Sequence, residues 1–405
     1  MLKNTLKSWR EPPPTAGLPL TWGDLLLATG SLERDLAEFV GAPYAQIECS
    51  ASAALVVALT TLKNLSSRRN VIIPAYTCPL VALALLQAGL QPVACDTRLG
   101  HFDFCPDALK NCCNEDTLAI MPTHLGGRLA DLATISQIAK SVGAYVVEDA
   151  AQSLGASTSG QAAGTLGDIG VYSLGVGKGL TIYGGGVIVT NDVLLSQQLH
   201  ATSLALAKKD TRQELKKIAE LIGYTALYRP STLKLVFGAP LRRHLQHGRL
   251  IQAVGDNHPH TIPMYRVGAW RKTVAAQALK RLPWFLAQTK AQATQRKARL
   301  QTIAGISVID DVQGEQGTWP YLLVLMPSQQ ARNSALAMLW PAGLGVGRMF
   351  IHALPDYPDL SAAFTNANTP NARDFAARTL TITNSPWLKD KEFERICVVL
   401  EASTA

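Results

Sequence analysis

Short apolar runs alternate with longer amphipathic stretches between residues 46 and 190. The apolar runs predict five buried strands, at 71–73, 92–95, 118–121, 145–148 and 186–190. Between several of them lie stretches typical of helices, at 52–62, 80–87 and 129–141. Strands that alternate with helices in this way indicate an α/β fold, with a parallel or mostly parallel sheet covered by helices on both faces.

The alternation breaks near residue 200. From there to residue 262 the chain is first basic and then apolar, and it ends in the turn-forming run 256–260. A long helical pattern begins at about residue 264, and strands and helices follow it to the end. We therefore predict an N-terminal arm and helix over 1–45, a large domain over 46–200, an insertion over 201–262 and a smaller C-terminal α/β domain over 263–405.

Composition supports a large folded core. Hydrophobic residues make up 47% of the 405 residues and charged residues only 17%, which argues against long disordered regions. The start lacks an apolar run of signal-peptide length, and no apolar stretch approaches the roughly 20 residues of a membrane span. We expect a cytoplasmic protein. The seven cysteines are scattered and form no CxxC pair, so we expect free thiols and no metal site.

The formal net charge of +8 is concentrated in one segment. Between residues 204 and 251, ten Lys or Arg face three Asp or Glu. This segment could bind the diphosphate of a nucleotide-linked sugar. Alternatively, its apolar stretches at 221–227 and 233–237 could rest on an anionic membrane surface. We slightly favour a third interpretation, a solvated helical insertion whose apolar side packs on the protein. We expect no nucleic-acid partner.

Three short segments carry candidate chemistry, and the first is Cys49-Ser50-Ala51-Ser52-Ala53-Ala54-Leu55. It closes a strand-like stretch and opens a helix. Small and hydroxyl residues at a helix start leave backbone N–H groups free, which is typical of a phosphate site. On this segment alone, a plain N-cap at Ser50 or Ser52 explains the pattern better.

The second segment, Val146-Val147-Glu148-Asp149-Ala150-Ala151-Gln152, runs from an apolar strand into adjacent acids. In open α/β sheets, ligands bind beyond the carboxyl ends of the strands. A carboxylate at Asp149 could hold the proton on a pyridine nitrogen and keep that ring electron-poor. Asp149 could equally cap the next helix.

The third segment places Lys178 in a glycine-rich turn after a strand, with few charges nearby. Such a lysine can be partly desolvated and can act as a nucleophile toward an aldehyde. A nucleotide P-loop is excluded by spacing, because it needs glycine where Tyr172 stands and Ser or Thr where Gly179 stands.

Together these segments resemble the DegT/DnrJ/EryC1/StrS family of sugar aminotransferases, which have the fold-type I architecture of pyridoxal-phosphate (PLP) enzymes. The resemblance is clear over 30–195 and weaker from 264 onward. Besides the three segments, it rests on Ile73-Pro74-Ala75-Tyr76-Thr77, His124-Leu125-Gly126-Gly127 and Tyr172-Ser173-Leu174.

The resemblance implies a PLP-dependent aminotransferase with a role for each matched residue. Lys178 would hold the cofactor as a Schiff base and move a proton during catalysis, and Asp149 would contact the pyridine nitrogen. Gln152 would lie near the ring hydroxyl. The remaining cofactor contacts would come from Ala51, Ser52 and Ser173 at the phosphate and from Cys78, at the position of the aromatic that usually stacks on the ring. Family members are usually homodimers with shared active sites.

Other residues near these motifs receive weaker assignments. Tyr76, Thr77 and His124 are expected around the pocket, with a structural role favoured for His124. Arg348 is a candidate contact for an anionic substrate group, and Asp168 is interpreted as a turn residue.

The chain departs from the family pattern at Cys78, at Gly184, where a glutamate is usual, and at Met264, where the Asn of an Asn-x-Arg element is usual. The favoured function is transfer of an amino group, often from glutamate in the family, to a keto group of a nucleotide-linked sugar in polysaccharide or secondary-metabolite biosynthesis. Two alternatives stay open. One is another PLP reaction such as sugar dehydration, which the retained Lys178 disfavours, and the other is a non-catalytic regulator or scaffold.

Overall fold

The computed structural model describes residues 10–27, 29–255 and 261–404. Its centre is a seven-stranded sheet in the order β1-β9-β8-β5-β4-β2-β3. Five strands are parallel, and β9 is antiparallel to both of its neighbours. The mostly parallel α/β sheet predicted from the sequence is therefore confirmed. The strands are β1 (Tyr44–Glu48), β2 (Asn70–Pro74), β3 (Gln91–Cys95), β4 (Thr117–Ile120), β5 (Tyr145–Asp149), β8 (Ile169–Ser173) and β9 (Gly186–Thr190).

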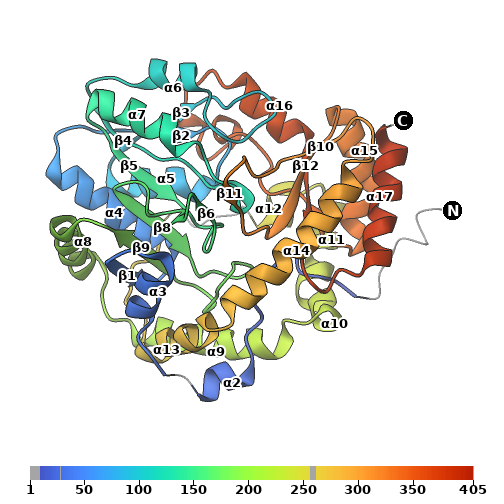
Figure 1. Cartoon of the computed structure of the whole chain (residues 1–405), viewed down its shortest axis with the longest axis horizontal. Coiled ribbons are helices and arrows are strands. Elements are labelled where there is room, and N and C mark those ends of the chain that lie inside the picture. Colours follow the sequence, from blue (N-terminus) through green and yellow to red (C-terminus); the bar gives the residue numbers. More distant parts are fainter. Residues whose placement is uncertain (1–9, 28, 256–260, 405) are drawn as a thin grey trace.

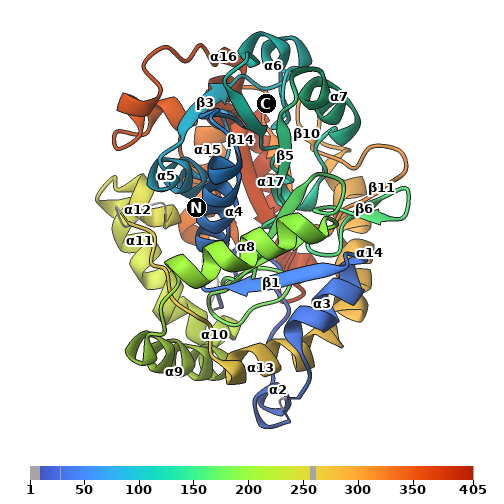
Figure 2. The same cartoon turned by 90° about the vertical axis from the view of Figure 1, so that its left-hand side faces the viewer.

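Helices cover this sheet on both faces (Figures 1 and 2). A central helix is α4, which packs against β8 and β9 and against α5 and α8. Its side chains are mostly Ala, Leu and Val, so it can be apolar all round, as a central helix requires. The helices of this part are α2 (Trp22–Leu26), α3 (Leu32–Val40), α4 (Ala51–Leu65), α5 (Pro79–Ala88), α6 (Pro106–Cys112), η1 (Leu125–Gly127), α7 (Leu132–Val142) and α8 (Val193–Leu206).

The predicted strands agree with the structure to within one residue at each end. One helix start is wrong: the helix expected from residue 129 begins at Leu132. The reason is local, because Asp131 caps the helix by accepting a hydrogen bond from the Thr134 amide at 3.1 Å.

A smaller four-stranded antiparallel sheet, in the order β10-β12-β14-β13, forms the C-terminal part with helices packed on it. A three-stranded ribbon, β11-β6-β7, links it to the large sheet. These elements are β6 (Ser157–Thr158), β7 (Gln161–Ala162), β10 (Ser307–Val308), β11 (Glu315–Gln316), β12 (Tyr321–Leu325), α15 (Gln329–Leu339), η3 (Trp340–Ala342), β13 (Val346–Gly347), η4 (Leu354–Asp356), η5 (Ser361–Ala363), α16 (Pro370–Arg378), β14 (Thr379–Thr383) and α17 (Asp390–Thr404).

The helical pattern expected from about residue 264 is two helices rather than one. They are α13 (Ala269–Leu279) and α14 (Leu282–Leu300). Pro283 stands in the first turn of α14, where its missing amide hydrogen is harmless, whereas it would interrupt a continuous helix. The long α14 runs from the large sheet to the small one (Figure 1).

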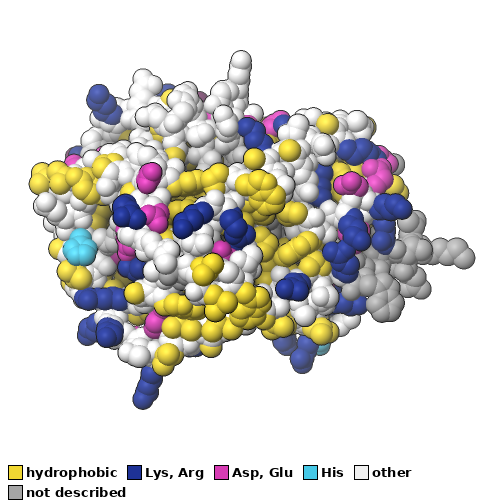
Figure 3. Space-filling model, turned by 60° about the horizontal axis from the view of Figure 1, so that its bottom comes forward, with side chains coloured by type: hydrophobic (Ala, Val, Ile, Leu, Met, Phe, Trp, Pro, Cys, Tyr) yellow, Lys and Arg dark blue, Asp and Glu magenta, His cyan; other side chains and the backbone are white. Residues whose placement is uncertain are grey.

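The basic segment is helical: α9 (Thr211–Leu227), α10 (Pro230–Leu233), the π-helical turn η2 (Lys234–Gly238), α11 (Ala239–Gln246) and α12 (Leu250–Val254). The predicted turn run 256–260 lies outside the described residues. Leu221 and Leu233 pack inward, as the favoured interpretation expects. However, α9 also exposes an apolar stripe, Leu215, Ala219, Ile222 and Ala226. Figure 3 shows hydrophobic patches among Lys and Arg on this side of the molecule.

The four-part division of the chain stays a prediction. Among the described residues, no helix combines the length and hydrophobicity that crossing a membrane requires.

The N-terminal segment fastens the glycine-rich loop that contains Lys178. Thr15 Oγ1 donates to the Gly177 carbonyl at 2.7 Å, and the Leu18 amide donates to the Gly179 carbonyl at 3.1 Å. Between them, Gly17 lies so close that a Cβ there would stand 2.7 Å from the Lys178 carbonyl oxygen. The loop is thus held from outside its own sequence neighbourhood.

We predict that Gly17→Ala destabilises the protein by about 1–3 kcal/mol, because the added methyl group meets backbone atoms that cannot move aside cheaply. Gly223→Ala is the matched control, since a Cβ at Gly223 in α9 meets no atom within 4 Å. That change should stabilise by about 0.5–1 kcal/mol. Urea unfolding of both variants measures the difference, and equal effects of the two would contradict the close packing.

Candidate active site

Four neighbouring strands end at one edge of the sheet, and the predicted site residues follow these ends. Ser173 closes β8 and Asp149 closes β5, while Thr123 follows β4 and Thr77 follows β2. The Thr77 and Thr123 hydroxyl groups are 2.9 Å apart, which ties two of the ends together directly. The carboxyl ends of parallel strands are where open α/β sheets bind ligands.

Lys178 and Asp149 lie close enough at this edge to influence each other's ionisation. Burial lowers the pKa of the Lys178 ammonium, and the neighbouring Cys78 and Asp149 oppose this shift. Burial raises the pKa of the Asp149 carboxyl, opposed by a hydrogen bond from the Ala151 amide and by the charge of Lys178. The structure thus brings Lys178, Asp149 and Cys78 together at this edge, and their contact with a cofactor stays a prediction.

Each of the two charged groups has an atom without a hydrogen-bond partner in the described part of the chain. Asp149 Oδ1 accepts the Ala151 amide at 3.2 Å. Within the described part of the chain, Asp149 Oδ2 and Lys178 Nζ have no hydrogen-bond partner. A nearly buried carboxylate oxygen and a desolvated amine without partners are suited to a ligand that supplies an N–H donor and an electrophilic carbon.

The start of α4 lies beside the end of β8. Ser50 caps this helix by accepting the Ala53 amide at 3.0 Å, and the first intrahelical donor is Ala54. The amides of Ala51 and Ser52 therefore precede the hydrogen-bonded turn and are available to an anion.

Ser173 reaches this helix start through its partner strand. It pairs with Gly186 across the β8–β9 ladder, and Gly186 packs so tightly on the backbone of Ser50 and Ala51 that a side chain would not fit. The Ser173 hydroxyl accepts the Gly175 amide at 3.2 Å, which orients it. Ala51, Ser52 and Ser173 are thereby brought to one place.

Gln152 is held by contacts from three parts of the chain. Its Oε1 accepts the Tyr321 hydroxyl at 2.7 Å and the Gly126 amide at 2.8 Å, while its Nε2 lies 3.8 Å from the Met349 sulfur. Sequence reasoning missed Tyr321 and Met349. They come from the small sheet and the segment after β13, and no local pattern links them to Gln152.

Glu148 and His124 form a closed buried network. The His124 Nε2 lies 2.8 Å from Glu148 Oε2, and its Nδ1 accepts the Ala130 amide at 3.0 Å. Glu148 also accepts three backbone amides at 2.6–2.7 Å. Every ring nitrogen and carboxylate oxygen is used, so His124 has the structural role that the sequence analysis favoured.

The remaining candidates lie away from Lys178 or serve the fold. Asp168 accepts the Val146 amide at 2.7 Å and so braces β5. Tyr76 is buried, with its ring packed edge-on against Phe350 and Phe375. Arg348 donates to the carbonyls of Ile351 and Ala376 and lines a cavity that none of the predicted cofactor residues share.

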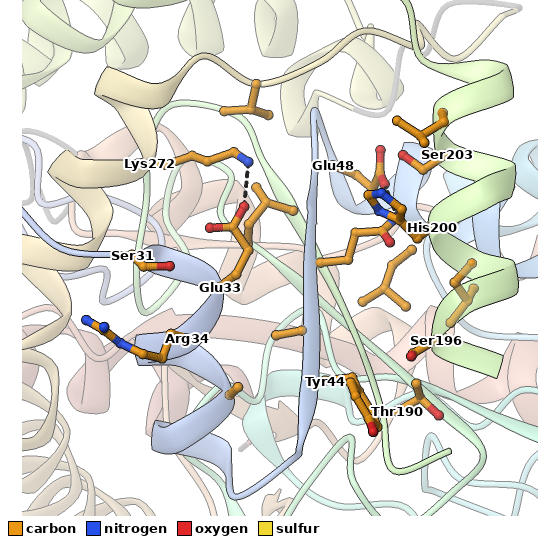
Figure 4. A pocket seen from close by; sticks show the side chains of 18 of the residues that line it. Ser31, Glu33, Arg34, Tyr44, Glu48, Thr190, Ser196, His200, Ser203 and Lys272 are labelled. Carbon is orange, nitrogen blue, oxygen red and sulfur yellow. Dashed lines mark hydrogen bonds and ion pairs between the residues drawn. The ribbon is translucent and has the colours of Figure 1, made fainter. Parts of the chain in front are cut away.

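A hollow of about 670 Å³ lies along the edge strand β1, between α3, α8 and α13 (Figure 4). Glu33 and Lys272 form an ion pair on one side of it, and Glu48 and His200 lie on the other. Arg266, from the position of the family's Asn-x-Arg element, also lines it and donates to the Ala207 carbonyl at 3.0 Å. None of the predicted cofactor residues lines this hollow.

Comparison with known proteins supports one family. A sequence model of the DegT/DnrJ/EryC1/StrS aminotransferase family matches residues 22–227 and 263–401, and leaves 228–262 unmatched. The solved structure of Spr1654 from Streptococcus pneumoniae in its PMP form superposes with a TM-score of 0.74 at 19% identity, over 98% of both chains. This likeness shows a shared fold.

Two curated relatives match part of the chain. A pleiotropic regulatory protein of Geobacillus stearothermophilus is 37% identical over 169 residues, which are 41% of this chain and 45% of the relative. A UDP-N-acetyl-3-dehydro-alpha-D-glucosamine 3-aminotransferase of Acidithiobacillus ferrooxidans is 34% identical over 170 residues, 42% of this chain and 46% of the relative. The aligned part thus spans less than half of each. Since the family model covers most of the sequence, the chain belongs to the DegT/DnrJ/EryC1/StrS aminotransferase family.

Proposed function

We propose that the protein is a PLP-dependent aminotransferase that moves an amino group, with glutamate as the expected donor, to a keto group of a nucleotide-linked sugar. The observation that carries this proposal is the pair Lys178 and Asp149, two charged groups that burial disfavours, beside a helix start rich in hydroxyl groups. A protein keeps such a pair when a ligand uses it.

The residues present fit the cofactor. The unpaired Asp149 Oδ2 suits a pyridinium N–H, and Lys178 suits an aldehyde. The phosphate of the cofactor would be held by the amides of Ala51 and Ser52 and by the Ser173 hydroxyl. When bound, PLP supplies an aldehyde that takes up an amino group and an electron-poor ring that stabilises negative charge at the substrate carbon.

The chain's own residues would then move one proton and fix several orientations. Because its pKa is lowered, Lys178 has a larger neutral fraction near neutral pH and can take the proton from the substrate carbon. Asp149 stays ionised beside a pyridinium, since an opposite charge favours its charged form. Tyr321 and Gly126 fix Gln152. Among the described residues its Nε2 contacts only the weak acceptor of Met349, so it can donate to a ring hydroxyl.

The acceptor and the alternative function are inferred from the relatives. The Acidithiobacillus enzyme, named for a UDP-linked keto sugar, supports an acceptor of that class. The regulatory name of the Geobacillus relative favours a second candidate, a regulator or scaffold that retained the fold. Against it stand Lys178 and Asp149, because a scaffold gains nothing from two charges that destabilise its apo form. A sugar dehydratase is disfavoured by the retained lysine.

A homodimer would cover the exposed stripe of α9. Leu215 and Ile222 are 60% and 40% exposed and lie two helical turns apart on one face. Helix α2, which carries the 79% exposed Leu26, lies on the same side of the molecule as α9 (Figure 1). Apolar area of this kind indicates an interface, and a second copy of this chain is the expected occupant. Contact of the 204–251 segment with a membrane and a cytoplasmic location stay predictions.

The first prediction from this proposed function concerns the visible spectrum of purified protein with added PLP. Wild type should show a yellow absorption band that glutamate bleaches, and Lys178→Ala should show neither property. Lys110→Ala, in an exposed lysine of α6, is the control and should behave as wild type. Turnover of Lys178→Ala should fall by about 10²–10⁴-fold, the usual contribution of a proton-transfer group.

A Lys178-dependent band that glutamate leaves unchanged would point to another donor or another PLP reaction. Absence of any band in wild type would overturn the enzyme assignment and favour the regulator.

The second prediction concerns pH and Asp149. An unfolded aspartate titrates near about 3.9, and the folded pKa of Asp149 is higher. Between the two values the folded state holds the proton that the unfolded state has released. Stability therefore falls as pH rises through this interval and stays lowered above it.

Asp149→Asn removes this penalty. In cofactor-free protein, its gain in Tm over wild type should be absent near pH 4 and should grow toward pH 7, whereas with PLP its kcat should drop by about 10²–10³-fold. Asp107→Asn, at an exposed carboxylate of α6, is the control and should show no gain in Tm that grows toward pH 7. A loss of apo stability in Asp149→Asn at pH 7 would contradict the assigned burial penalty.

The third prediction concerns assembly. Leu215→Glu/Ile222→Glu should weaken the dimer by at least about 100-fold in Kd, because charges replace two apolar side chains that the dimer would bury. Leu99→Glu, at a residue that is 76% exposed after β3, should leave the dimer intact. Light scattering on a sizing column reads the mass of each.

Co-sedimentation with anionic vesicles at low salt tests the alternative occupant of the same face. If wild type is monomeric and sediments with vesicles, this face contacts a membrane surface rather than a second copy of the chain.

A further inference from the structure

A second cavity, of about 640 Å³, is enriched in arginine. It lies between the start of α15, the segment after β13, the end of α16 and the start of α12. Four arginines line it, Arg249, Arg332, Arg348 and Arg373, and Asp356 is the one acid among its described lining residues. None of the residues assigned to the cofactor lines this cavity.

Arg332 is the unusual member. It is only 3% exposed, and within the described part of the chain its guanidinium has neither a carboxylate partner nor a hydrogen bond. Burial and the neighbouring charge of Arg348 lower its pKa to about 10. It also stands in the first turns of α15, where the helix dipole favours a negative charge nearby.

The protein treats its other buried arginines differently. Arg128 pairs with Asp311 at 2.8 Å, and Arg271 pairs with Glu214 at 2.5 Å. Arg296 donates to the carbonyls of Thr383 and Leu388. Buried charges are normally compensated in this way, so Arg332 is the exception that calls for an external partner.

The neighbours of Arg332 support an anion rather than a neutral ligand. Arg348 is half-buried and is held in the wall by the carbonyls of Ile351 and Ala376, at 2.5 and 2.9 Å. Asp356 is already engaged by Arg373, which donates to both of its oxygens at 2.9–3.1 Å. Asp356 is thus paired with Arg373 and does not compensate the charge of Arg332.

One wall of the cavity comes from the segment that the family model leaves unmatched. Arg249 and the start of α12 lie within 228–262. The cavity is therefore partly built by a feature outside the family's common architecture. It still lies close to the cofactor edge, because Met349, the neighbour of Arg348, contacts Gln152.

We propose that this cavity binds a phosphate-bearing anion, with Arg332 and Arg348 at its floor and Arg249 at its rim. Phosphate oxygens accept charge-assisted hydrogen bonds from guanidinium groups in fixed geometry. The volume exceeds that of one phosphate group, so a diphosphate or a phosphorylated small molecule fits the class better. This site goes beyond the aminotransferase activity, which it does not require.

The test uses the full-length protein saturated with PLP, so that the proposed cofactor phosphate seat is filled. Inorganic diphosphate is titrated by calorimetry at low salt. We expect wild type to bind with a Kd below about 1 mM, and Arg332→Met to bind at least about tenfold more weakly. Arg34→Met is the control: Arg34 is an arginine of the β1 hollow in Figure 4, its side chain is 74% exposed, and its loss should change nothing.

Stability separates a lost ligand contact from a damaged fold. Because Arg332→Met removes an unpaired buried charge, its Tm without diphosphate should equal or exceed that of wild type, and diphosphate should raise Tm in wild type alone. Equal diphosphate affinity in wild type and Arg332→Met would overturn the proposal, and so would no binding by wild type at millimolar concentration.

A further titration with UDP identifies the source of the phosphate. If Arg332→Met binds both UDP and diphosphate more weakly than wild type does, the cavity is assigned to a nucleotide-linked ligand. If only diphosphate binding is weakened, the cavity is assigned to a free phosphorylated metabolite. The glutamate-dependent bleaching needs no acceptor and should be unchanged in Arg332→Met. Failure of the anion site is therefore distinguishable from failure of the proposed enzyme function.

Discussion

The attraction between Lys178 and Asp149 in a desolvated recess is the interaction on which the site depends. Burial disfavours the charge on each, and each partly restores the other's charge. Such a pair persists only if the backbone holds both ends, because free side chains would turn to water. The sheet holds Asp149 at the end of β5. The lysine loop has no strand of its own, and the N-terminal segment holds it instead, through Thr15 and Leu18. Thr15, which lies 162 positions from Gly177 in the sequence, thus helps to fix the loop of the reactive amine.

Two adjacent acids at the end of β5 show how backbone direction assigns chemistry. Successive side chains of a strand point to opposite faces. Glu148 points to a face where His124 and three amides saturate its carboxylate, while Asp149 points to the ligand edge and receives a single amide. A saturated carboxylate has no free lone pair in a useful direction, so it stabilises the turn around Gly164–Gly167. The unsaturated neighbour retains one oxygen for a ligand. The adjacent carboxylates of Glu148 and Asp149 therefore carry different roles.

The sequence predicted what local patterns encode. Strand ends came from apolar runs, and the order of the site residues came from motifs that follow those ends. The start of α7 and the break between α13 and α14 were misplaced, because one capping aspartate and one proline outweigh hydrophobic periodicity. Tyr321, Met349 and the Thr15–Leu18 contacts could not be predicted, since they join residues far apart in sequence that only the tertiary fold brings together. The unpaired state of Arg332 was equally invisible, because a sequence shows charges but no partners.

The two candidate sites share one physical feature, a buried charged group that lacks partners. In each, a charged group is kept in a desolvated position without its full set of partners. Stability is reduced locally, and a ligand that completes the set regains it on binding. At the sheet edge this feature belongs to the part of the chain that the family model matches. In the arginine cavity, one wall is formed by the start of α12, which belongs to the unmatched segment. Arg249 from this segment adds a positive charge to the wall of a cavity that already contains Arg332 and Arg348, and this favours an anionic ligand there.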